Sequence, residues 1–213
     1  MKFAAAITLF AASASAFSPF GVASKKAATV AAPAFTVETI PGALEPVGIW
    51  DPLGFAAKAD EKTLKRYREA ELTHGRVAML AAIGFLAGEA VEGSSFLWDA
   101  SVTGPAISHL AQVPPLFWAL LVTGIGAAEQ KRAEIGWVDP ADVPVDQPGL
   151  LRADYTPGDI GFDPLGLKPE DPEELLVLQN KELQNGRLAM LAAAGFMAQE
   201  LVDGKGIIEH FMH

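Results

Sequence analysis

A long internal repeat constrains the fold of this chain more than any other feature of its sequence. Residues 71–93 read ELTHGRVAMLAAIGFLAGEAVEG and residues 182–204 read ELQNGRLAMLAAAGFMAQELVDG, so fifteen of 23 positions are identical at an offset of 111. The similarity extends upstream, where Asp51-Pro52-Leu53-Gly54 recurs as Asp163-Pro164-Leu165-Gly166. Solenoids repeat every 20–50 residues or so and need about three copies. Two copies this far apart therefore predict a pair of equivalent elements within one domain.

Both copies have the composition of an α-helix, because they are rich in Ala, Leu, Met and Glu. The second copy is preceded by Asp171-Pro172-Glu173-Glu174, which places an N-cap Asp, a Pro at the first helical position and acids in the first turn. We expect helices over about 60–92 and 171–203. Each would be roughly 50 Å long at 1.5 Å per residue. A helix of that length exceeds the thickness of a bilayer core and would tilt or protrude.

A third apolar segment lies between the two copies. Residues 100–128 carry no formal charge, and the helix in this region is expected over about 115–132, from the Pro114-Pro115 pair onward. That length is at the short end for a transmembrane span. By length alone, a buried helix of a soluble bundle remains the alternative.

Charge placement favours the membrane. No Lys or Arg occurs between Val77 and Gln130, and the bases cluster at one end of each expected helix. They are Lys62, Lys65, Arg66, Arg68 and Arg76 in the first, Lys131 and Arg132 in the second, and Lys181 and Arg187 in the third. In an up-down-up arrangement all of them lie on one side, as the positive-inside bias predicts. The sequence thus predicts an all-α membrane protein with three transmembrane helices and a short amphipathic helix after Gly204.

Ionisable residues inside such helices need partners. Five residues separate Glu71 from Arg76, and Glu182 from Arg187, which is about 140° around a helix, so neither pair can form within its own helix. If the two long helices cross about a pseudo-two-fold axis, Glu71 pairs with Arg187 and Glu182 with Arg76, and each pair is neutral. Small residues would permit the close crossing: Gly75, Ala78, Ala82, Gly186, Ala189 and Ala193.

The same helices carry residues suited to metal ligation. Glu71 and His74 share a face, as do Glu182 and Asn185, because each pair is three residues apart. His74 aligns with Asn185, and the property that these two side chains share is a lone pair. Several separate Mg centres fit this pattern, each with four macrocycle nitrogens and one protein ligand, since Mg accepts oxygen donors and also imidazole. A hydrogen-bonded core histidine is the alternative for His74.

Residues 1–37 have the composition of a targeting sequence, with three Lys and no acid. Lys2 precedes the apolar run 3–12, and Ala14-Ser15-Ala16 follows as a cleavage site of the A-x-A type. We therefore expect a signal peptide cleaved near Ala16/Phe17, followed by a transit peptide to about residue 37. The tetrapeptide Ala14-Ser15-Ala16-Phe17 resembles the plastid-targeting junction of algae with red-derived secondary plastids; a plain secretory signal is the alternative.

Composition excludes several other classes. The chain has no Cys, so disulfides, thiolate metal sites and a Cys nucleophile are absent. A net charge of −10 argues against binding to nucleic acid, which needs a basic face. Residues 134–174 contain eleven acids and two bases and are expected to form a solvated surface loop.

The motifs Glu71-x-x-His74-Gly75-Arg76 and Glu182-x-x-Asn185-Gly186-Arg187 resemble the paired helices of the light-harvesting chlorophyll-binding family, over roughly residues 45–210. With its leader, the chain resembles the fucoxanthin chlorophyll a/c members of diatom-like algae. The resemblance implies a three-helix domain over 38–213, multi-pass in the plastid thylakoid membrane. It also implies an antenna without enzymatic activity that binds chlorophyll a, chlorophyll c and fucoxanthin or related carotenoids. Implied partners are thylakoid lipid, a photosystem I or II core and other antenna subunits in a homo- or hetero-oligomer.

The resemblance also assigns residues. It implies that Glu71, His74, Glu129, Glu182, Asn185 and Gln199 are axial ligands of chlorophyll Mg, with Arg76 and Arg187 beside them. His210 joins this set, although it does not align cleanly with the terminal His of the family. Carotenoid end groups would lie against Trp50, Asp51, Pro52, Phe162, Asp163 and Pro164. Ordinary turn chemistry is the alternative for these loops.

Two other functions remain open. A photoprotective quencher of the same family would use the same ligands. A di-metal oxidase also carries Glu-x-x-His on bundle helices, but it needs two such motifs on four helices. In this chain the second copy has Asn185, and no fourth long helix is expected.

Overall fold

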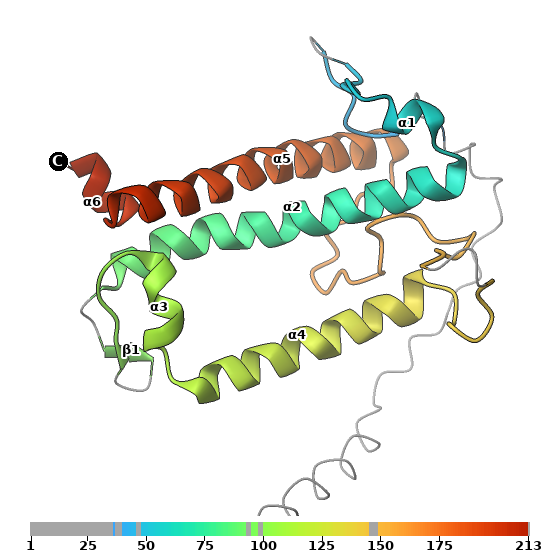
Figure 1. The fold of residues 1–213 in the computed structure, drawn as a ribbon. Helices are drawn as coiled ribbons and strands as arrows, with labels where there is room; N and C mark the ends of the chain where they lie inside the picture. The colour runs from blue at the N-terminus through green and yellow to red at the C-terminus, as the bar shows by residue number, and fades with distance from the viewer. Residues whose placement is uncertain are drawn as a thin grey trace, which may run out of the picture. The chain divides into compact units, whose positions relative to one another are not determined.

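The computed structural model describes residues 36, 40–45, 48–92, 95–97, 100–144 and 149–212. The predicted signal and transit peptides, with the cleavage site near Ala16, lie outside this part of the chain apart from residue 36. The described elements are α1 (Phe55–Lys58), α2 (Glu61–Ala90), β1 (Ser95–Leu97), β2 (Ala100–Ser101), α3 (Ala106–Gln112), α4 (Pro115–Gly136), α5 (Pro172–Asp203) and α6 (Ile207–Met212). The two strands form a small antiparallel hairpin, and the rest of the fold is helical (Figure 1).

The long helices α2 and α5 begin and end within two residues of the expected bounds, because local capping defines them. The Asp60 carboxylate accepts a hydrogen bond from the Thr63 amide at 3.2 Å, and Asp171 caps α5 in the same way. Pro172 occupies the first turn of α5, where its missing N–H costs nothing. At the other end Gly204 takes a left-handed conformation with φ +65° and stops the helix.

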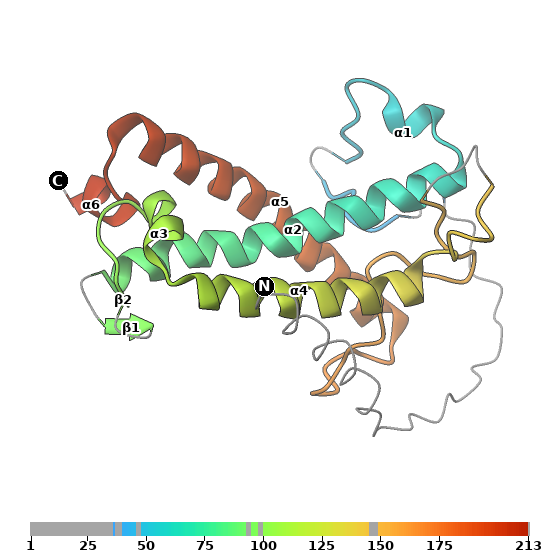
Figure 2. The same cartoon turned by 60° about the horizontal axis from the view of Figure 1, so that its bottom comes forward.

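α2 and α5 cross in close contact (Figures 1 and 2). The approach is closest at Gly75 and Gly186, where a Cβ added to either residue would lie 3.0 Å from the Cα of the other. Ala78, Ala189 and Ala193 are buried beside this point. The predicted crossing of equivalent helices through small residues is thus confirmed.

The middle helix, α4, is four residues longer at its C-terminal end than expected. The Lys131–Glu134 ion pair, 2.9 Å, joins the end of the expected helix to the added turn. The hairpin and α3, which precede α4 in the chain, are not among the elements predicted from the sequence. α3 and α4 meet at an angle of 104°, and the Trp118 indole N–H donates to the Leu110 carbonyl at 3.0 Å across this corner. Among the described residues of α4 only Gly136 is buried, so α4 stands apart from the pair α2 and α5.

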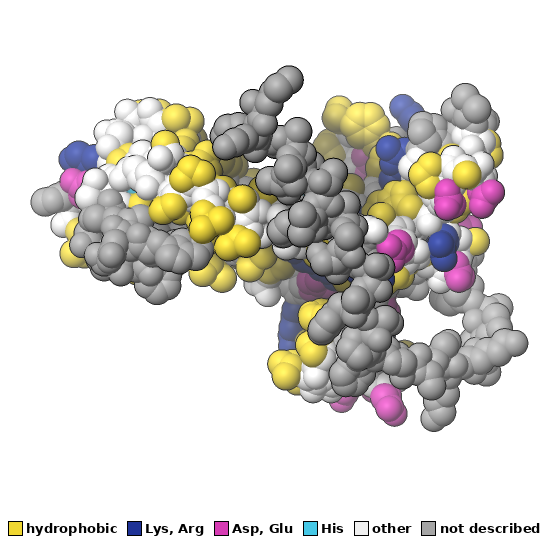
Figure 3. All heavy atoms as spheres, turned by 90° about the horizontal axis from the view of Figure 1, so that it is seen from below, with side chains coloured by type: hydrophobic (Ala, Val, Ile, Leu, Met, Phe, Trp, Pro, Cys, Tyr) yellow, Lys and Arg dark blue, Asp and Glu magenta, His cyan; other side chains and the backbone are white. Residues whose placement is uncertain are grey.

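None of the described helices, taken alone, is both long and apolar enough to qualify as a membrane span, although α3 and α4 qualify together as a bent pair. The predicted helical fold is confirmed. The length and hydropathy of the individual helices do not by themselves identify three transmembrane spans. The basic ends of α2, α4 and α5 do lie at the same end (Figure 1). Large apolar side chains on all three are exposed, including Val77, Leu80, Ile83, Leu120, Val122, Leu188 and Leu191. Many hydrophobic side chains gather on the face in Figure 3, with most charged groups towards one end.

The segment after α4 differs in part from the solvated loop that its acidic composition predicted. Leu151 and Tyr155 are buried, with Tyr155 only 6% exposed. The Tyr155 ring packs on Gly136, where an added Cβ would lie 3.1 Å from Cζ. The Val138 amide also donates to the Leu150 carbonyl at 3.0 Å. Most described residues of this segment are still exposed, so it is a surface loop as expected. Its net charge gave no indication of the few apolar side chains that dock it.

Two buried carboxylates, Glu89 and Glu200, organise the opposite end of the helix pair. They are 111 residues apart, the offset of the repeat. Glu89 accepts from the amides of Ile207 and Ile208 at 2.7 Å and caps α6, whereas Glu200 accepts from the Ile107 amide at 2.7 Å at the start of α3. Each long helix therefore caps the short helix that follows the other long helix in the sequence. The predicted short C-terminal helix is present as α6.

Candidate functional site

Two ion pairs link α2 to α5 across the glycine crossing. Arg187 Nε donates to Glu71 Oε1 at 2.8 Å, and Arg76 Nε donates to Glu182 Oε1 at 2.7 Å. This is the pairing predicted from the repeat. Because both pairs join the same two helices on either side of one crossing point, they fix the rotation of each helix as well as its position.

Each of these arginines also holds a loop glycine. Arg187 Nη1 donates to the Gly42 carbonyl at 2.7 Å, and Arg76 Nη2 donates to the Gly158 carbonyl at 3.0 Å. Both glycines have positive φ, +103° and +84°. A Cβ on Gly158 would lie 2.6 Å from Leu72 Cδ1, so any other residue here would displace the Leu72 side chain and strain a backbone with positive φ.

The repeat also supplies the acceptors for the amides of these glycines. The Gly42 amide donates to Asn180 Oδ1 at 2.5 Å, and the Gly158 amide donates to Glu69 Oε2 at 2.7 Å. Glu69 and Asn180 are 111 residues apart and thus equivalent in the two copies. Two loops far apart in the sequence are therefore held against the crossed helices by matching contacts.

The prediction of two neutral pairs is wrong for the first pair. Arg68 Nη1 donates to the second oxygen of Glu71 at 2.7 Å, so Glu71 lies between two guanidinium groups. The position equivalent to Arg68 in the second copy is Gln179, which carries no charge. Within the described part of the chain, Oε2 of Glu182 accepts no hydrogen bond and remains available as a ligand.

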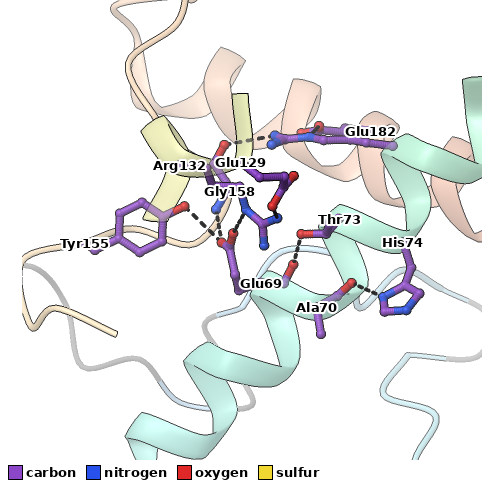
Figure 4. Close-up of polar contacts among 10 residues, drawn as sticks. Glu69, Ala70, Thr73, His74, Glu129, Arg132, Tyr155, Gly158 and Glu182 are labelled. Atoms are coloured by element: carbon purple, nitrogen blue, oxygen red, sulfur yellow. Dashed lines mark hydrogen bonds and ion pairs between the residues drawn. The ribbon is translucent and has the colours of Figure 1, made fainter. Parts of the chain in front are cut away.

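His74 has the arrangement of a metal ligand more than that of a core histidine. Its side chain is exposed, and Nδ1–H donates to the Ala70 carbonyl at 2.7 Å (Figure 4). In the neutral ring this bond leaves the lone pair on Nε2, which is how a backbone carbonyl orients a ligating imidazole. Asn185, at the equivalent position, is also exposed.

Asp203 connects two further candidate ligands at the end of α5. The Asp203 carboxylate accepts a hydrogen bond from the side-chain amide Nε2 of Gln199, and His210 Nδ1 lies 2.8 Å from the same carboxylate. Gln199 keeps its carbonyl oxygen and His210 keeps Nε2 for another partner. The sequence analysis did not predict that these two residues share an acceptor.

Glu129 belongs to a network whose centre the sequence analysis missed. Arg132 Nη1 donates to Glu129 Oε2 at 2.7 Å, and Arg132 Nε donates to Glu69 Oε1 at 3.0 Å (Figure 4). Glu69 is 3% exposed and also accepts from the Tyr155 hydroxyl at 3.0 Å. Burial and then the Glu69 carboxylate raise the pKa of Tyr155 to about 12. The repeat gave no signal for Glu69, because the equivalent Asn180 is uncharged.

The two Asp-Pro-Leu-Gly loops form matching turns. The Asp51 carboxylate accepts from the amides of Phe55 and Ala56 at 3.0 and 2.8 Å, and Asp163 accepts from Leu167 and Lys168 at 3.0 and 2.9 Å. The amide of Lys168 and then that of Leu167 lower the pKa of Asp163. The residues beside each Asp are exposed, with Trp50 at 78% and Phe162 at 79% and both prolines, Pro52 and Pro164, at the surface.

Each ion pair borders a cavity. One, of about 850 Å³, is lined by Trp50, Phe55, Glu71 and Arg187 among others. The other, of about 240 Å³, is lined by Arg76, Asp159, Lys168 and Glu182 among others. Among the described residues, no group of three or more His, Asp or Glu could hold a free metal ion. The donors are arranged singly, which suits metal centres that bring their remaining ligands with them.

Comparisons with known proteins identify relatives of this chain. A sequence model of the family described as "Chlorophyll A-B binding protein" matches residues 36–201. The chain is 52% identical over 176 residues to light-harvesting complex stress-related protein 3.2 of Chlamydomonas reinhardtii, covering 81% of this chain and 67% of the relative. It is 48% identical to a fucoxanthin-chlorophyll a-c binding protein of Isochrysis galbana, covering 78% of this chain and 77% of the relative. A third relative, fucoxanthin-chlorophyll a-c binding protein F of Phaeodactylum tricornutum, is 34% identical and covers 94% of this chain and 95% of its own length.

Proposed function

We propose the function from a premise that the comparisons establish: the chain belongs to the chlorophyll a/b-binding protein family. It is a light-harvesting antenna protein that binds chlorophyll and a carotenoid of the fucoxanthin type, and it passes excitation energy to a photosystem. The observation that carries this function is the crossed pair of helices, in which each Glu–Arg ion pair lies beside an exposed lone-pair donor, His74 or Asn185.

In this proposal α2, α4 and α5 span the plastid thylakoid membrane. Two observations support the placement: large apolar side chains are exposed along all three helices, and the bases gather at one end. Lipid and pigment would cover the apolar side chains, and the basic end would remain on the side of insertion. A photosystem I or II core and other antenna subunits are the protein partners.

In this proposal six side chains would hold chlorophyll through its Mg, with His210 as a further donor: Glu71, His74, Glu129, Glu182, Asn185 and Gln199. When bound, the pigments supply light absorption and excitation transfer. The protein residues orient the donors: the Ala70 carbonyl directs the His74 lone pair, and arginines neutralise the carboxylates. The two Asp-turn loops, which follow the glycines bonded by Arg187 and Arg76, would seat carotenoid end groups beside Trp50 and Phe162.

The absorption spectrum and pigment extract of the native complex test this function. We expect chlorophyll a, chlorophyll c and a keto-carotenoid to co-purify with the protein. Recovery of a colourless but stably folded protein from thylakoids would contradict the proposal.

A photoprotective role within the same family is the second candidate, and the 52% identity to a stress-related light-harvesting protein favours it. The fluorescence lifetime of the purified complex separates the two roles. A quencher should show a shorter lifetime at low pH than at neutral pH, whereas a dedicated antenna should keep a long lifetime at both.

A further inference from the structure

We propose that Glu69 is a positioning residue, which holds α4 against α2 and, through Arg132, fixes the carboxylate of Glu129 for its pigment. The inference rests on the proposed function, because it assumes that Glu129 is a ligand. It adds a residue that neither the repeat nor the ligand motifs indicate, and it explains how the isolated third helix keeps its place.

The Glu69 carboxylate joins three segments of the chain. Arg132 Nε of α4 donates to Oε1 at 3.0 Å, while the Tyr155 hydroxyl and the Gly158 amide donate to Oε2 at 3.0 and 2.7 Å. Glu69 itself belongs to α2 and is 3% exposed. One buried carboxylate thus locks α4 and the following loop onto the long helix, with one hydrogen bond from α4 and two from the loop (Figure 4).

α4 has little other attachment to the helix pair. Within the described residues, the Glu69–Arg132 ion pair is the only polar side-chain contact between α4 and either α2 or α5. Only Gly136 of α4 is buried. The position of Glu129 relative to the helix pair therefore depends on this contact near the end of α4 where Glu129 lies.

Arg132 transmits the constraint to Glu129. Its guanidinium uses Nε for Glu69 and Nη1 for Glu129, so the planar group sets the direction of both carboxylates together. The Trp137 ring lies 4.9 Å from Arg132 Cζ and limits its other rotamers. Glu129 is exposed, with 57% of its side chain accessible, and without the anchored arginine nothing else in the described residues would orient it.

The test uses the full chain refolded with a thylakoid pigment extract. Four variants are compared with the wild type: Glu69→Gln, Glu129→Leu, the double variant, and Glu134→Gln as a control. Glu134 makes an exposed ion pair with Lys131 on the same helix, so its substitution removes the same charge without touching the network. Pigment stoichiometry and the absorption difference spectrum against wild type are measured for each.

We expect Glu129→Leu to lose about one chlorophyll per chain and Glu69→Gln to lose most of that same pigment, with the same difference spectrum. In Glu69→Gln the charge pair with Arg132 is lost, and the amide NH2 must face either the Arg132 guanidinium or the donors Tyr155 and Gly158. Both orientations weaken the hold on the guanidinium. The double variant should lose no more than Glu129→Leu alone, and Glu134→Gln should match the wild type.

Two results would overturn the inference. In one, Glu129→Leu loses a pigment but Glu69→Gln keeps the full complement. In the other, Glu69→Gln loses several different pigments to the same extent, which would mean that Glu69 supports the fold in general and does not position Glu129. If Glu69→Gln does not assemble, Glu69→Asp is used, because it keeps the buried charge and shortens only the reach; full occupancy in that variant would also overturn the inference.

A readout independent of pigment accompanies these measurements. Titration of the Tyr155 Cζ signal by NMR should show a lower pKa in Glu69→Gln than in the wild type, because burial still raises the pKa but the neighbouring carboxylate is gone; an unchanged pKa would overturn the assigned contact. If the proposed function itself is wrong, the result is different: the wild type will also take up no pigment. If Glu129→Leu alone keeps every pigment, Glu129 is not a ligand and this inference falls while the other sites stand.

Discussion

A hydrogen bond at one ring nitrogen fixes the orientation of the His74 imidazole. Because Nδ1–H is bonded to the Ala70 carbonyl, only Nε2 can act as a ligand. We expect His74→Leu to lose about one chlorophyll and to leave the oligomeric state unchanged, since no ion pair is broken. Pigment stoichiometry after refolding measures the effect.

The repeat supplies a matched control for that substitution. His74→Asn introduces the residue found at position 185, which keeps a lone pair, and it should retain the pigment at least in part. Unaltered stoichiometry in His74→Leu would mean that His74 is not an axial ligand. Equal loss in both variants would mean that the lone pair is not the property that matters.

Tyr155 should give the fold a specific sensitivity to alkali. Burial, followed by the Glu69 carboxylate, raises its pKa from 10.0 to about 12, so the folded state favours the neutral phenol. The stabilisation that depends on this shift is complete below about pH 10 and is lost as the pH rises towards about 12. Tyr155→Phe should be less stable at neutral pH by about 1 kcal/mol for one hydrogen bond. The difference in melting temperature from wild type should shrink over that alkaline range.

An NMR titration of the Tyr155 Cζ signal checks the shift directly. The pKa of Tyr155 should lie well above 10.0, near the value of about 12 that burial and the Glu69 carboxylate give it. Titration of Tyr155 at about pH 10 would show that its buried contact with Glu69 is not maintained in solution.

At the scale of the elements, the crossing of α2 and α5 depends on glycine. A Cβ on Gly75 would lie 3.0 Å from the Gly186 Cα, which is backbone and cannot move aside without separating the helices. Gly75→Ala should cost about 1–3 kcal/mol, the range for overpacking, despite the better helix propensity of Ala. Thermal unfolding of the refolded complex would register this loss.

Gly84 offers the control on the same helix. A Cβ there would meet no protein atom within 4 Å, so Gly84→Ala should gain up to about 1 kcal/mol in helix propensity. If Gly75→Ala proves as stable as Gly84→Ala, the helices do not approach as closely as the structure indicates.

The ion pairs of the crossing can be tested by exchange of partners. Arg187→Leu should impair assembly, because Glu71 then keeps only Arg68 of its own helix and no longer joins α2 to α5. Adding Glu71→Gln breaks no further link between the two helices, so this double variant should assemble better than the other combination. Adding Glu182→Gln should abolish assembly, because it also leaves Arg76 without its partner on α5.

Refolding with pigments, scored by energy transfer from chlorophyll c to chlorophyll a, compares the two double variants. Arg68 limits the expected assembly of the Glu71→Gln combination, since it keeps its positive charge there beside a neutral amide. Equal assembly of both combinations would contradict the pairing and the symmetric crossing with it.

The parts of the fold that follow the repeat were predictable, and the parts that break it were not. The crossing, both ion pairs and the long helices follow from the residue types at equivalent positions and from local caps such as Asp60 and Asp171. Glu69 was missed because its role depends on Tyr155, 86 residues away, and no local pattern connects the two. α3 was missed because Glu200, on the other long helix, accepts from its first turn. The ligand roles stay predictions, since they concern groups that are not part of the chain.

For the molecule as a whole, the three long helices are held in two different ways. α2 and α5 are joined by backbone contact at the glycines, by two ion pairs and by the Phe85–Phe196 ring contact at 6.0 Å. α4 is held by Arg132, by the docked loop around Tyr155 and by its bent connection to α3. If pigment fills the space beside α4, removing it should loosen that helix and leave the crossed pair intact.

Spin labels can measure this difference, because the chain contains no Cys and every introduced thiol is unique. One pair of labels replaces Leu86 of α2 and Val122 of α4, and the control pair replaces Leu86 and Val202 of α5; all three side chains are exposed. With pigment bound, pulsed electron paramagnetic resonance should give narrow distance distributions for both pairs.

After pigment extraction into detergent, the α2–α4 distribution should broaden and the α2–α5 distribution should stay narrow. The bound pigments stabilise the arrangement by linkage, about 2.7 kcal/mol for a single ligand at a hundredfold excess over its Kd. The anchor at Glu69 lies near one end of α4 and cannot by itself prevent the rest of the helix from moving. Broadening of both distributions would show that the crossed pair also depends on pigment, and broadening of neither would show that α4 is held by protein contacts alone.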